Sequence, residues 1–435
     1  MTKSAIFTIL FLLFVHQLFA QQYGNFTKVP LAVGIFPPLS TNGNHAGDCV
    51  NQISLNLIMG YSAGLAGVEY GFINTERDFV HGVQIAGFGN FVAGEFTGFQ
   101  FASFGNFNKG ISNGFQFAGF SNFNYNQADG VLAAGFFNFT NGKSFAVQAA
   151  GFANFCEDIE GIQAAGFANV VKGNGKATQL AGLANITLGE INGVQVAGFL
   201  NFSQQKMQNV QASGFMNISN DDATGVQIAG AVNIAKGDLS GVQISGLLNV
   251  AKKVKGFQLG FVNIADTIES GIPIGVLSIV KKGFREMEIS VGEGINAQAS
   301  FKIGVDKFYN IFAIGTQVIG SEYSWGFGYG IGTHLSKNDR FKTQLELMSF
   351  HINEGEAWTD GDNELQQAKV TFTKKVSDHF SIFAGPTMNL MITKNKDNHD
   401  QPFTSHFAPY EIVSHSGKNT TLQGWIGFTA GIHIN

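Results

Sequence analysis

Residues with metal-ligand chemistry gather near the end of the chain. His399, Asp400, His406 and His415 lie close together in a polar stretch. Imidazole and carboxylate groups are ligands of zinc, and structural zinc sites hold them at short, regular spacings. The spacing here is irregular, and no element that would fix these side chains is predicted around them. The sequence therefore predicts solvated loop histidines, with no metal site and no cofactor.

Two carboxylate pairs, Glu354 with Glu356 and Asp360 with Asp362, are the other candidates for acid and base chemistry. Such pairs divide the two roles when their surroundings separate their pKa values. Both pairs lie in a polar stretch that is typical of a solvated loop. The chain also lacks a phosphate-binding loop, a nucleophile elbow and a His-Glu-x-x-His helix. We predict no catalytic residue, and the chain is expected not to be an enzyme.

Side-chain amides are the polar groups with regular spacing. Glutamines recur every 15 or 16 residues from Gln84 to Gln258, once Leu132 is accepted in place of one of them. In most units an asparagine follows six positions later, as in Gly82-Val-Gln-Ile-Ala-Gly-Phe-Gly-Asn-Phe91. A fixed period of this kind is typical of repeat architectures, in which each unit packs only on its neighbours. Glu69 and Pro273 replace glutamine in the weaker flanking units, where capping repeats are expected.

Two architectures compete for this array. In a β-solenoid every unit is one coil, whereas in an antiparallel barrel every unit is one strand and alternate connections differ in length. The connections here stay near six residues and do not alternate. The sequence therefore predicts a β-solenoid of about 16-residue repeats over residues 67–283, with fourteen units.

Stacking explains the recurrence of the amides. Equivalent residues of successive coils lie about 4.8 Å apart, so Asn and Gln can form hydrogen-bonded ladders along the axis. We predict buried amide ladders with stacked phenylalanines filling the interior. The alternative is an exposed row of amides that reads a polymer. The predicted structural ladder residues are Gln84, Asn90, Gln100, Asn106, Gln116, Asn122, Gln148, Asn154, Gln195, Asn201, Gln227, Asn233, Gln243 and Asn249.

After Phe284 the period changes to two. Tyr323, Trp325, Phe327, Tyr329 and Ile331 alternate with Ser or Gly, which is the pattern of a half-buried strand. Eight such strands predict a small antiparallel β-barrel-like domain over residues 284–435, because closure removes exposed edges. The predicted strands are residues 287–292, 297–305, 309–318, 323–332, 341–347, 368–376, 380–392 and 421–434.

The barrel-like domain favours a membrane location. Its strands have about ten residues, and a short turn near residues 377–378 contrasts with long connections at 353–366 and 394–420, as in outer-membrane barrels. The chain ends Ile434-Asn435 without the terminal aromatic common in such barrels. A soluble or peripheral β domain therefore stays open as the alternative.

The first residues predict export. Lys3 precedes an apolar run that ends in Leu18-Phe19-Ala20, so residues 1–20 are predicted to be a signal peptide. Residues 21–66 are predicted to be an N-terminal β segment that pairs with the C-terminal sheet. The net charge of -5 comes without a basic run, so no nucleic-acid partner is expected. Cys49 and Cys156 have no metal-site spacing and are interpreted as unrelated thiols, with a disulfide, which an exported compartment would permit, as the alternative.

The repeats and the segments upstream of them resemble those of a known protein family. The Gly-x-Gln-x-Ala-Gly-x-x-Asn units, with Phe36-Pro-Pro-Leu-Ser-Thr-Asn-Gly43 and Ser54-Leu-Asn-Leu57 upstream, resemble a family of bacterial surface-repeat proteins of Gram-negative groups, whose function is unknown. The resemblance implies export and surface placement, and it implies no activity for individual residues. The expected location is the outer membrane or cell surface, with the periplasm as the alternative.

Two functions follow. The first is a non-enzymatic surface protein in which the array is a structural or adhesive platform displayed by a barrel anchor. The second is an outer-membrane pore or small-molecule carrier, with the repeats as plug or cover. The outer membrane is the expected partner, together with a protein or glycan surface. Long loops on a rigid scaffold usually carry recognition, so we predict partner contact in residues 394–420 through Phe403, Phe407 and Tyr410.

Overall fold

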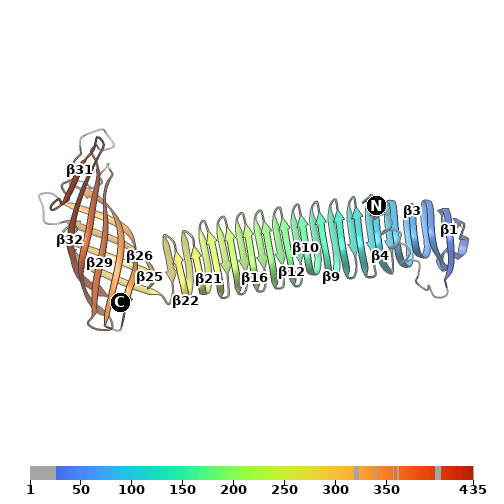
Figure 1. Cartoon of the computed structure of the whole chain (residues 1–435), viewed down its shortest axis with the longest axis horizontal. Coiled ribbons are helices and arrows are strands. Elements are labelled where there is room, and N and C mark those ends of the chain that lie inside the picture. The colour runs from blue at the N-terminus through green and yellow to red at the C-terminus, as the bar shows by residue number, and fades with distance from the viewer. Residues whose placement is uncertain are drawn as a thin grey trace, which may run out of the picture. The chain divides into compact units, whose positions relative to one another are not determined.

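The chain is almost entirely β structure. The computed structural model describes residues 26–317, 323–338, 340–355, 357–359, 362–396 and 403–434, and the predicted signal peptide lies outside them. The predicted fold class is confirmed: a β-solenoid of about 13 turns of roughly 16 residues is followed by a closed eight-strand antiparallel barrel (Figure 1). The chain forms two compact units, Met1–Gly237 and Asp238–Asn435. Among the described residues, no helix combines the length and apolarity needed to cross a membrane.

The N-terminal segment belongs to the solenoid sheet. It contains β1 (Thr27–Phe36), β2 (Leu39–Ser40), the 3₁₀ helix η1 (Gly43–Asp48) and the start of β3 (Cys49–Val92). Strand β1 pairs in parallel with β3 and forms a short antiparallel hairpin with β2. The prediction that residues 21–66 pair with the C-terminal sheet is therefore wrong for the described part of this segment. A parallel sheet has an open edge, and a hairpin that covers it prevents pairing with other chains.

The coils of the first unit stack in register. Gln100 lies opposite Gln116, and Asn106 lies opposite Asn122, because a step of 16 residues brings equivalent positions together. Strands that carry the glutamine position are β4 (Glu95–Ala102), β6 (Ser112–Ala118), β8 (Ala128–Ala134), β9 (Phe137–Ala150), β10 (Ala153–Ala165), β12 (Gly175–Ala181), β14 (Ile191–Ala197), β16 (Met207–Ser213) and β18 (Ala223–Ala229). The short strands that carry the asparagine are β5 (Gly105–Asn108), β7 (Ser121–Asn124), β11 (Ala168–Val171), β13 (Ala184–Thr187), β15 (Leu200–Ser203), β17 (Met216–Ser219) and β19 (Val232–Ala235).

In most coils a glycine two residues before the glutamine position bends the long strand, whereas Ala146, Ala177 and Asn209 occupy this position in β9, β12 and β16. Gly114 has φ +133°, and a Cβ there would lie 2.1 Å from the carbonyl oxygen of Gly98 in the preceding coil. Only glycine adopts this conformation at so close an approach without strain. Phe115 and Phe117 face outward and Gln116 faces inward, so β6 itself keeps the alternation of a strand. The alternation breaks at the turn after β6, where the adjacent residues Ser121 and Asn122 are both buried.

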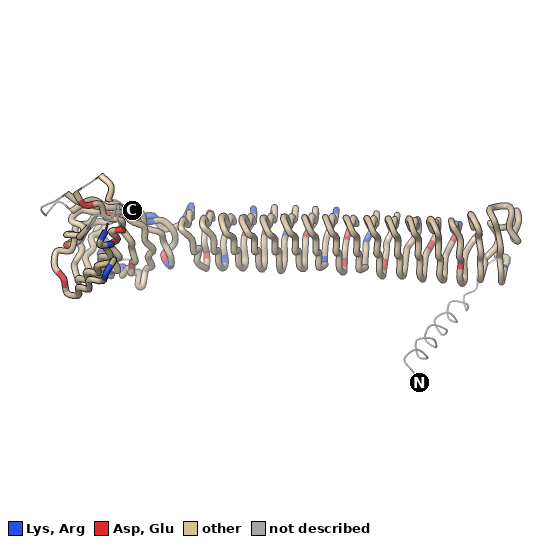
Figure 2. The backbone as a smooth tube through the Cα atoms, turned by 90° about the horizontal axis from the view of Figure 1, so that it is seen from above, with Lys and Arg blue, Asp and Glu red and all other residues tan. Residues whose placement is uncertain are grey.

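The interior of the first unit is polar, and its phenylalanines lie outside. Phe88, Phe104, Phe120, Phe136 and Phe152 form a stacked row with ring centroids 4.9–5.1 Å apart. These side chains are 37–40% exposed. The prediction that stacked phenylalanines fill the interior is wrong, because amides, small side chains and single large apolar side chains such as Phe96 and Met207 occupy the space between the two strands of the coils. Figure 2 shows that charged residues are sparse along these coils.

The second unit begins with coils of the same type and continues into the barrel. Its coils contain β20 (Leu239–Ser245), β21 (Leu248–Leu259), β22 (Val262–Ile274) and β23 (Leu277–Val280). Within this unit the Asn310 side chain meets the last coil: its Oδ1 accepts from Ser278 N at 2.8 Å, and its Nδ2 donates to Gly275 O at 2.7 Å. These bonds satisfy backbone groups that no further coil pairs with in the described structure.

Eight strands close the barrel, since β24 pairs with both β25 and β32. All eight predicted strands are present, several of them longer than predicted, and the short strand β31 (Val413–Ser416) lies beside β32. The barrel strands are β24 (Phe284–Gly292), β25 (Ala297–Val305), β26 (Phe308–Gln317), β27 (Ser324–Lys337), β28 (Phe341–Glu354), β29 (Asn363–Lys375), β30 (Phe380–Lys394) and β32 (Thr420–Ile434).

Candidate functional site

The asparagine ladder is continuous through the first unit. The Asn90 Nδ2 donates to Asn106 Oδ1 at 2.8 Å, and Asn106 Nδ2 donates in the same way to Asn122 at 2.8 Å. The remaining steps from Asn74 to Asn233 repeat this bond at 2.8–3.0 Å. Each Nδ2 thus points to the following coil.

The glutamine ladder runs in the opposite direction. Gln100 Nε2 donates to Gln84 Oε1 at 2.9 Å, and Gln84 Nε2 donates to the Glu69 carboxylate at 2.9 Å. The glutamine at 163 and those at 179, 195, 211 and 227 each donate to the preceding glutamine at 2.7–2.8 Å. The two rows of amide dipoles therefore oppose each other. Leu132 interrupts the glutamine row, and it is fully buried beside Ala128 and Ala146.

The ladder amides are not available to a ligand. Every predicted ladder residue, in both units, is at most 1% exposed. Buried amides whose hydrogen bonds are met by neighbouring coils stabilise one packing arrangement. The alternative, an exposed row that reads a polymer, is contradicted by this burial.

Two buried carboxylates lie at the start of the glutamine row. Glu69 accepts hydrogen bonds from Asn56 Nδ2 at 2.8 Å and from Gln84, and Ser62 Oγ donates to Glu76. Burial, together with the nearby charge of Glu69, raises the pKa of Glu76 well above the ordinary glutamate value. Burial also raises the pKa of Glu69, although its hydrogen bonds oppose the shift. Such a pair binds a proton more tightly than an exposed glutamate does.

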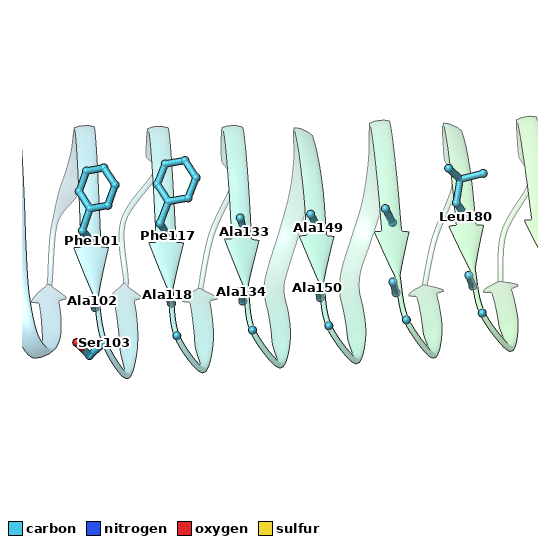
Figure 3. A pocket seen from close by; sticks show the side chains of 18 of the residues that line it. Phe101, Ala102, Ser103, Phe117, Ala118, Ala133, Ala134, Ala149, Ala150 and Leu180 are labelled. Carbon is cyan, nitrogen blue, oxygen red and sulfur yellow. The ribbon is translucent and has the colours of Figure 1, made fainter.

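An apolar groove follows the outer surface of the first unit. It has a volume of about 990 Å³, and its floor consists of alanine and glycine that follow the glutamines. We name the residues directly after the glutamine position the ridge row: Ile85, Phe101, Phe117, Ala133, Ala149, Ala164, Leu180 and Val196. Three successive alanines hollow this row between Phe117 and Leu180 (Figure 3). The sequence contains this run of small residues. Because the apolar side chains were predicted to fill the interior, no apolar groove was predicted on the outer surface.

The barrel lumen contains a buried ion-pair network that the sequence interpretation missed. Lys302 Nζ lies 2.6 Å from Glu288 Oε2 and 2.5 Å from Glu346 Oε1, and Lys369 Nζ lies 2.7 Å and 3.0 Å from the same two carboxylates. His433 Nε2 lies 3.0 Å from Glu288 Oε2. These side chains are at most 2% exposed. The signal was present: Glu286 and Glu288 alternate with Met287 and Ile289 in a predicted strand.

The barrel wall is apolar outside. In β24, Met287, Ile289 and Val291 are exposed, whereas Glu286 and Glu288 are buried. Strand β25 repeats the pattern with exposed Phe301 and buried Gln298, Ser300 and Lys302. In these two strands polar groups therefore face the lumen and apolar groups face outward, which reverses the arrangement of a water-soluble sheet. The lumen also holds a buried apolar cluster that includes Phe350 and Trp425.

The loop predicted to contact a partner is partly packed structure. Phe407 is 2% exposed and belongs to a buried barrel cluster with Trp425 and Ile295. The assignment of Phe407 to partner contact is therefore wrong. Phe403 is half-buried, while Tyr410 is exposed and donates from its hydroxyl to the Ile426 carbonyl. A large apolar side chain in a loop is ambiguous by sequence, because it can bind a partner or fill the barrel end.

The residues with acid, base or metal-ligand types do not form a site in the described structure. His399 and Asp400 lie outside the described residues, and so do Glu356 and Asp360. His406 and His415 are exposed. Among the described residues, no group of three His, Cys, Asp or Glu could hold a metal ion.

The remaining candidate groups are structural. Glu354 binds the loop, because Ser405 Oγ and His406 N both donate to its carboxylate. Cys49 and Cys156 are free and buried, and burial raises the pKa of the Cys156 thiol to about 12. A thiol in this state is protonated and a poor nucleophile.

Comparison with known proteins adds no functional information. No protein-family model, no curated protein and no solved structure matches this chain.

Proposed function

We propose that this chain is a non-enzymatic surface protein of the bacterial envelope, anchored in the outer membrane by its barrel. The observation that carries the proposal is the alternation in β24, where exposed Met287, Ile289 and Val291 separate buried Glu286 and Glu288. Lipid provides a solvent in which an apolar outer wall is stable, and transmembrane barrels combine such a wall with a polar interior. Closure of all eight strands satisfies the backbone hydrogen bonds within that wall.

An anchor fits the lumen better than a pore does. An eight-strand barrel is only wide enough for its own side chains. Here Lys302, Lys369, Glu288 and Glu346 meet in the centre, and their contacts of 2.5–3.0 Å join opposite parts of the wall. Tyr309 adds a hydrogen bond to Glu346 at 2.9 Å. An ion crossing the lumen would have to break this network, so we expect no steady conductance in planar bilayers.

The repeat array supports a role as a scaffold. In the first unit every coil pairs with its neighbours through backbone bonds and through at least one amide ladder. A stack of this kind resists bending at any one coil, and it presents its outer rows at a constant spacing. A protein or glycan surface is the partner class that the proposal assigns to this scaffold.

Fractionation with surface proteolysis tests the proposal. The full chain would be expressed in a Gram-negative host, and the envelope would be separated and washed with alkaline carbonate. We expect the protein to stay with the outer membrane and a protease added to whole cells to cleave it. Recovery in the periplasm, or release by the wash, would contradict the anchor. Resistance to protease in intact cells, with cleavage after lysis, would contradict surface display.

A further inference from the structure

The ridge row of the first unit contains a projection and a depression of matching shape, so its surface is self-complementary. Phe101 and Phe117 stack with ring centroids 5.1 Å apart and form a raised part of the row. Ala133, Ala149 and Ala164 follow as the hollow, and Leu180 closes it. Figure 3 shows the two rings and the alanines on the same face of successive strands. One stretch of surface therefore carries both a projection of two coils and a depression of three.

The lining of the groove restricts what can cover it. Ser103 is the one lining residue with a polar side chain among the described residues. A carbohydrate or an extended peptide bound there would lose hydrogen bonds to water and gain almost none in return. The groove thus requires an apolar occupant.

The apolar area is that of a small protein interface. The alanine and glycine floor is bordered by the ridge row, whose large side chains are about two-fifths exposed. An aromatic side chain of roughly 200 Å² then presents about 80 Å². The large members of the ridge row together present on the order of 400 Å², compared with about 800 Å² per partner in a standard interface, which is the range of a weak, concentration-dependent dimer. The large members are Ile85, Phe101, Phe117, Leu180 and Val196.

We propose that this groove is the interface with a second copy of the chain, related by a two-fold axis through Ala133. A two-fold interface uses the same patch on both copies, so residue i contacts j and j contacts i. With the axis at Ala133, Phe117 faces Ala149 of the second copy and Phe101 faces Ala164. Each projection then fills the other copy's depression. The interface uses residues of the first unit only, so it does not depend on the proposed membrane anchor.

A residue swap tests both the occupant and the register. Ala149→Phe fills the depression, and it is compatible with the fold because phenylalanine occupies the same row at Phe101 and Phe117. The double variant Ala149→Phe with Phe117→Ala exchanges projection and depression across the two-fold axis. Ala212→Phe adds the same side chain to this row beyond the groove and serves as the matched control. Full-length chains would be transferred from detergent to an amphipathic polymer, and light scattering would give their molar mass.

We expect a concentration-dependent dimer for the parent and for Ala212→Phe. Overpacking in Ala149→Phe should weaken association roughly tenfold or more, and the double variant should regain most of it. A monomeric parent, or a dimer unaffected by Ala149→Phe, would overturn the proposal. Failure of the double variant to recover would overturn the register. A fluorescent fatty acid that the parent binds, and that both variants lose, would assign the groove to hydrocarbon chains and overturn the second copy.

Discussion

Asn201 illustrates how a single ladder residue stabilises the array. Its Nδ2 donates to Asn217 Oδ1 at 2.9 Å and to the Ala212 carbonyl at 2.7 Å, while its Oδ1 accepts from Asn185 at 2.9 Å. The side chain is fully buried. Each amide thus acts as donor and acceptor at once, and no other side chain of this size offers both groups in this geometry.

The first prediction follows from that double role. Asn201→Asp removes the donor and places a carboxylate against two acceptor oxygens, where burial disfavours its charge. We expect the free energy of unfolding to fall by roughly 3 kcal/mol or more, because unmatched buried charges are costly. Thermal unfolding of the full chain, followed by circular dichroism, measures the change. Asn113→Asp, at an exposed position, should melt like the parent. Equal melting temperatures for Asn201→Asp and Asn113→Asp would contradict the contribution of the ladder to stability.

Glu76 makes stability depend on pH. Burial and the charge of Glu69 raise its pKa in the folded chain, whereas an unfolded glutamate titrates near pH 4.3. Above that pH the folded state binds more protons than the unfolded state, so the free energy of unfolding falls as the pH rises. Glu76→Gln removes this loss. We expect the variant to be more stable than the parent at pH 8 and to differ much less at pH 4.

Denaturant unfolding at the two pH values measures this effect. The exposed Glu190→Gln is the matched control, and it should leave the pH dependence of the parent unchanged. If Glu76→Gln keeps the parent's pH dependence, another group is responsible.

Residue types and period were enough to anticipate amide ladders, but not which other side chains lie inside. A stack of phenylalanines about 4.8 Å apart is equally regular on the inner or the outer surface of a coil. The choice depends on the space between the two strands, and in this chain Gln116 and Asn122 fill that space. The turn after β6 also breaks the alternation on which the assignment of faces depended, because the adjacent residues Ser121 and Asn122 are both buried.

Among the elements, the loop before β32 contains both a residue that packs into the barrel and a residue that is predicted to contact a partner. Its Phe407 reaches into the barrel, and Glu354 at the end of β28 accepts hydrogen bonds from Ser405 and His406. The loop therefore closes one end of the barrel. Its residue Tyr410 is exposed, so partner contact through Tyr410 stays a prediction, whereas the buried Phe407 is excluded from it.

The loop assignment leads to the third prediction. Phe407→Ala leaves a cavity beside Trp425 and should lower the stability of the barrel by about 3 kcal/mol. Phe403→Ala, which changes a half-buried side chain, should cost less. The temperature at which the barrel loses its compact migration on unheated gels measures both variants. A larger effect at Phe403 than at Phe407 would contradict the packing described here.

At the element scale, the barrel strands could be predicted from the sequence, whereas the strand with which β1 pairs could not. A period of two located all eight barrel strands, because each alternates between lumen and outer wall. The partner of β1 was assigned to the wrong sheet, since its exposed Leu31 and Val33 fit the outer face of either sheet. Alternation identifies a strand, whereas the partner depends on contacts far apart in the sequence.

At the scale of the whole molecule, both units bury polar side chains and expose apolar ones. In the first unit the interior holds the amide ladders and the carboxylates of Glu69 and Glu76, and the outer rows are phenylalanine and aliphatic residues. In the barrel the interior holds charged pairs beside an apolar cluster that includes Phe350 and Trp425, and the outer wall is apolar. Water as the solvent on every side would penalise so much apolar area. The barrel is therefore expected to meet lipid, and the groove of the first unit another copy of the chain.

The last prediction tests the environment of the barrel wall. Ile289 is 50% exposed near the middle of β24, between the buried Glu288 and Ser290. In a lipid-facing wall, Ile289→Arg should cost about 2–4 kcal/mol near the bilayer midplane. The carbonate-resistant fraction of the protein should fall accordingly, while Ile289→Leu keeps the wall apolar and should behave like the parent. A water-facing wall predicts no difference between the two variants, because a solvated arginine would leave folding intact. Membrane recovery of Ile289→Arg equal to that of Ile289→Leu would therefore exclude a lipid-facing position for β24.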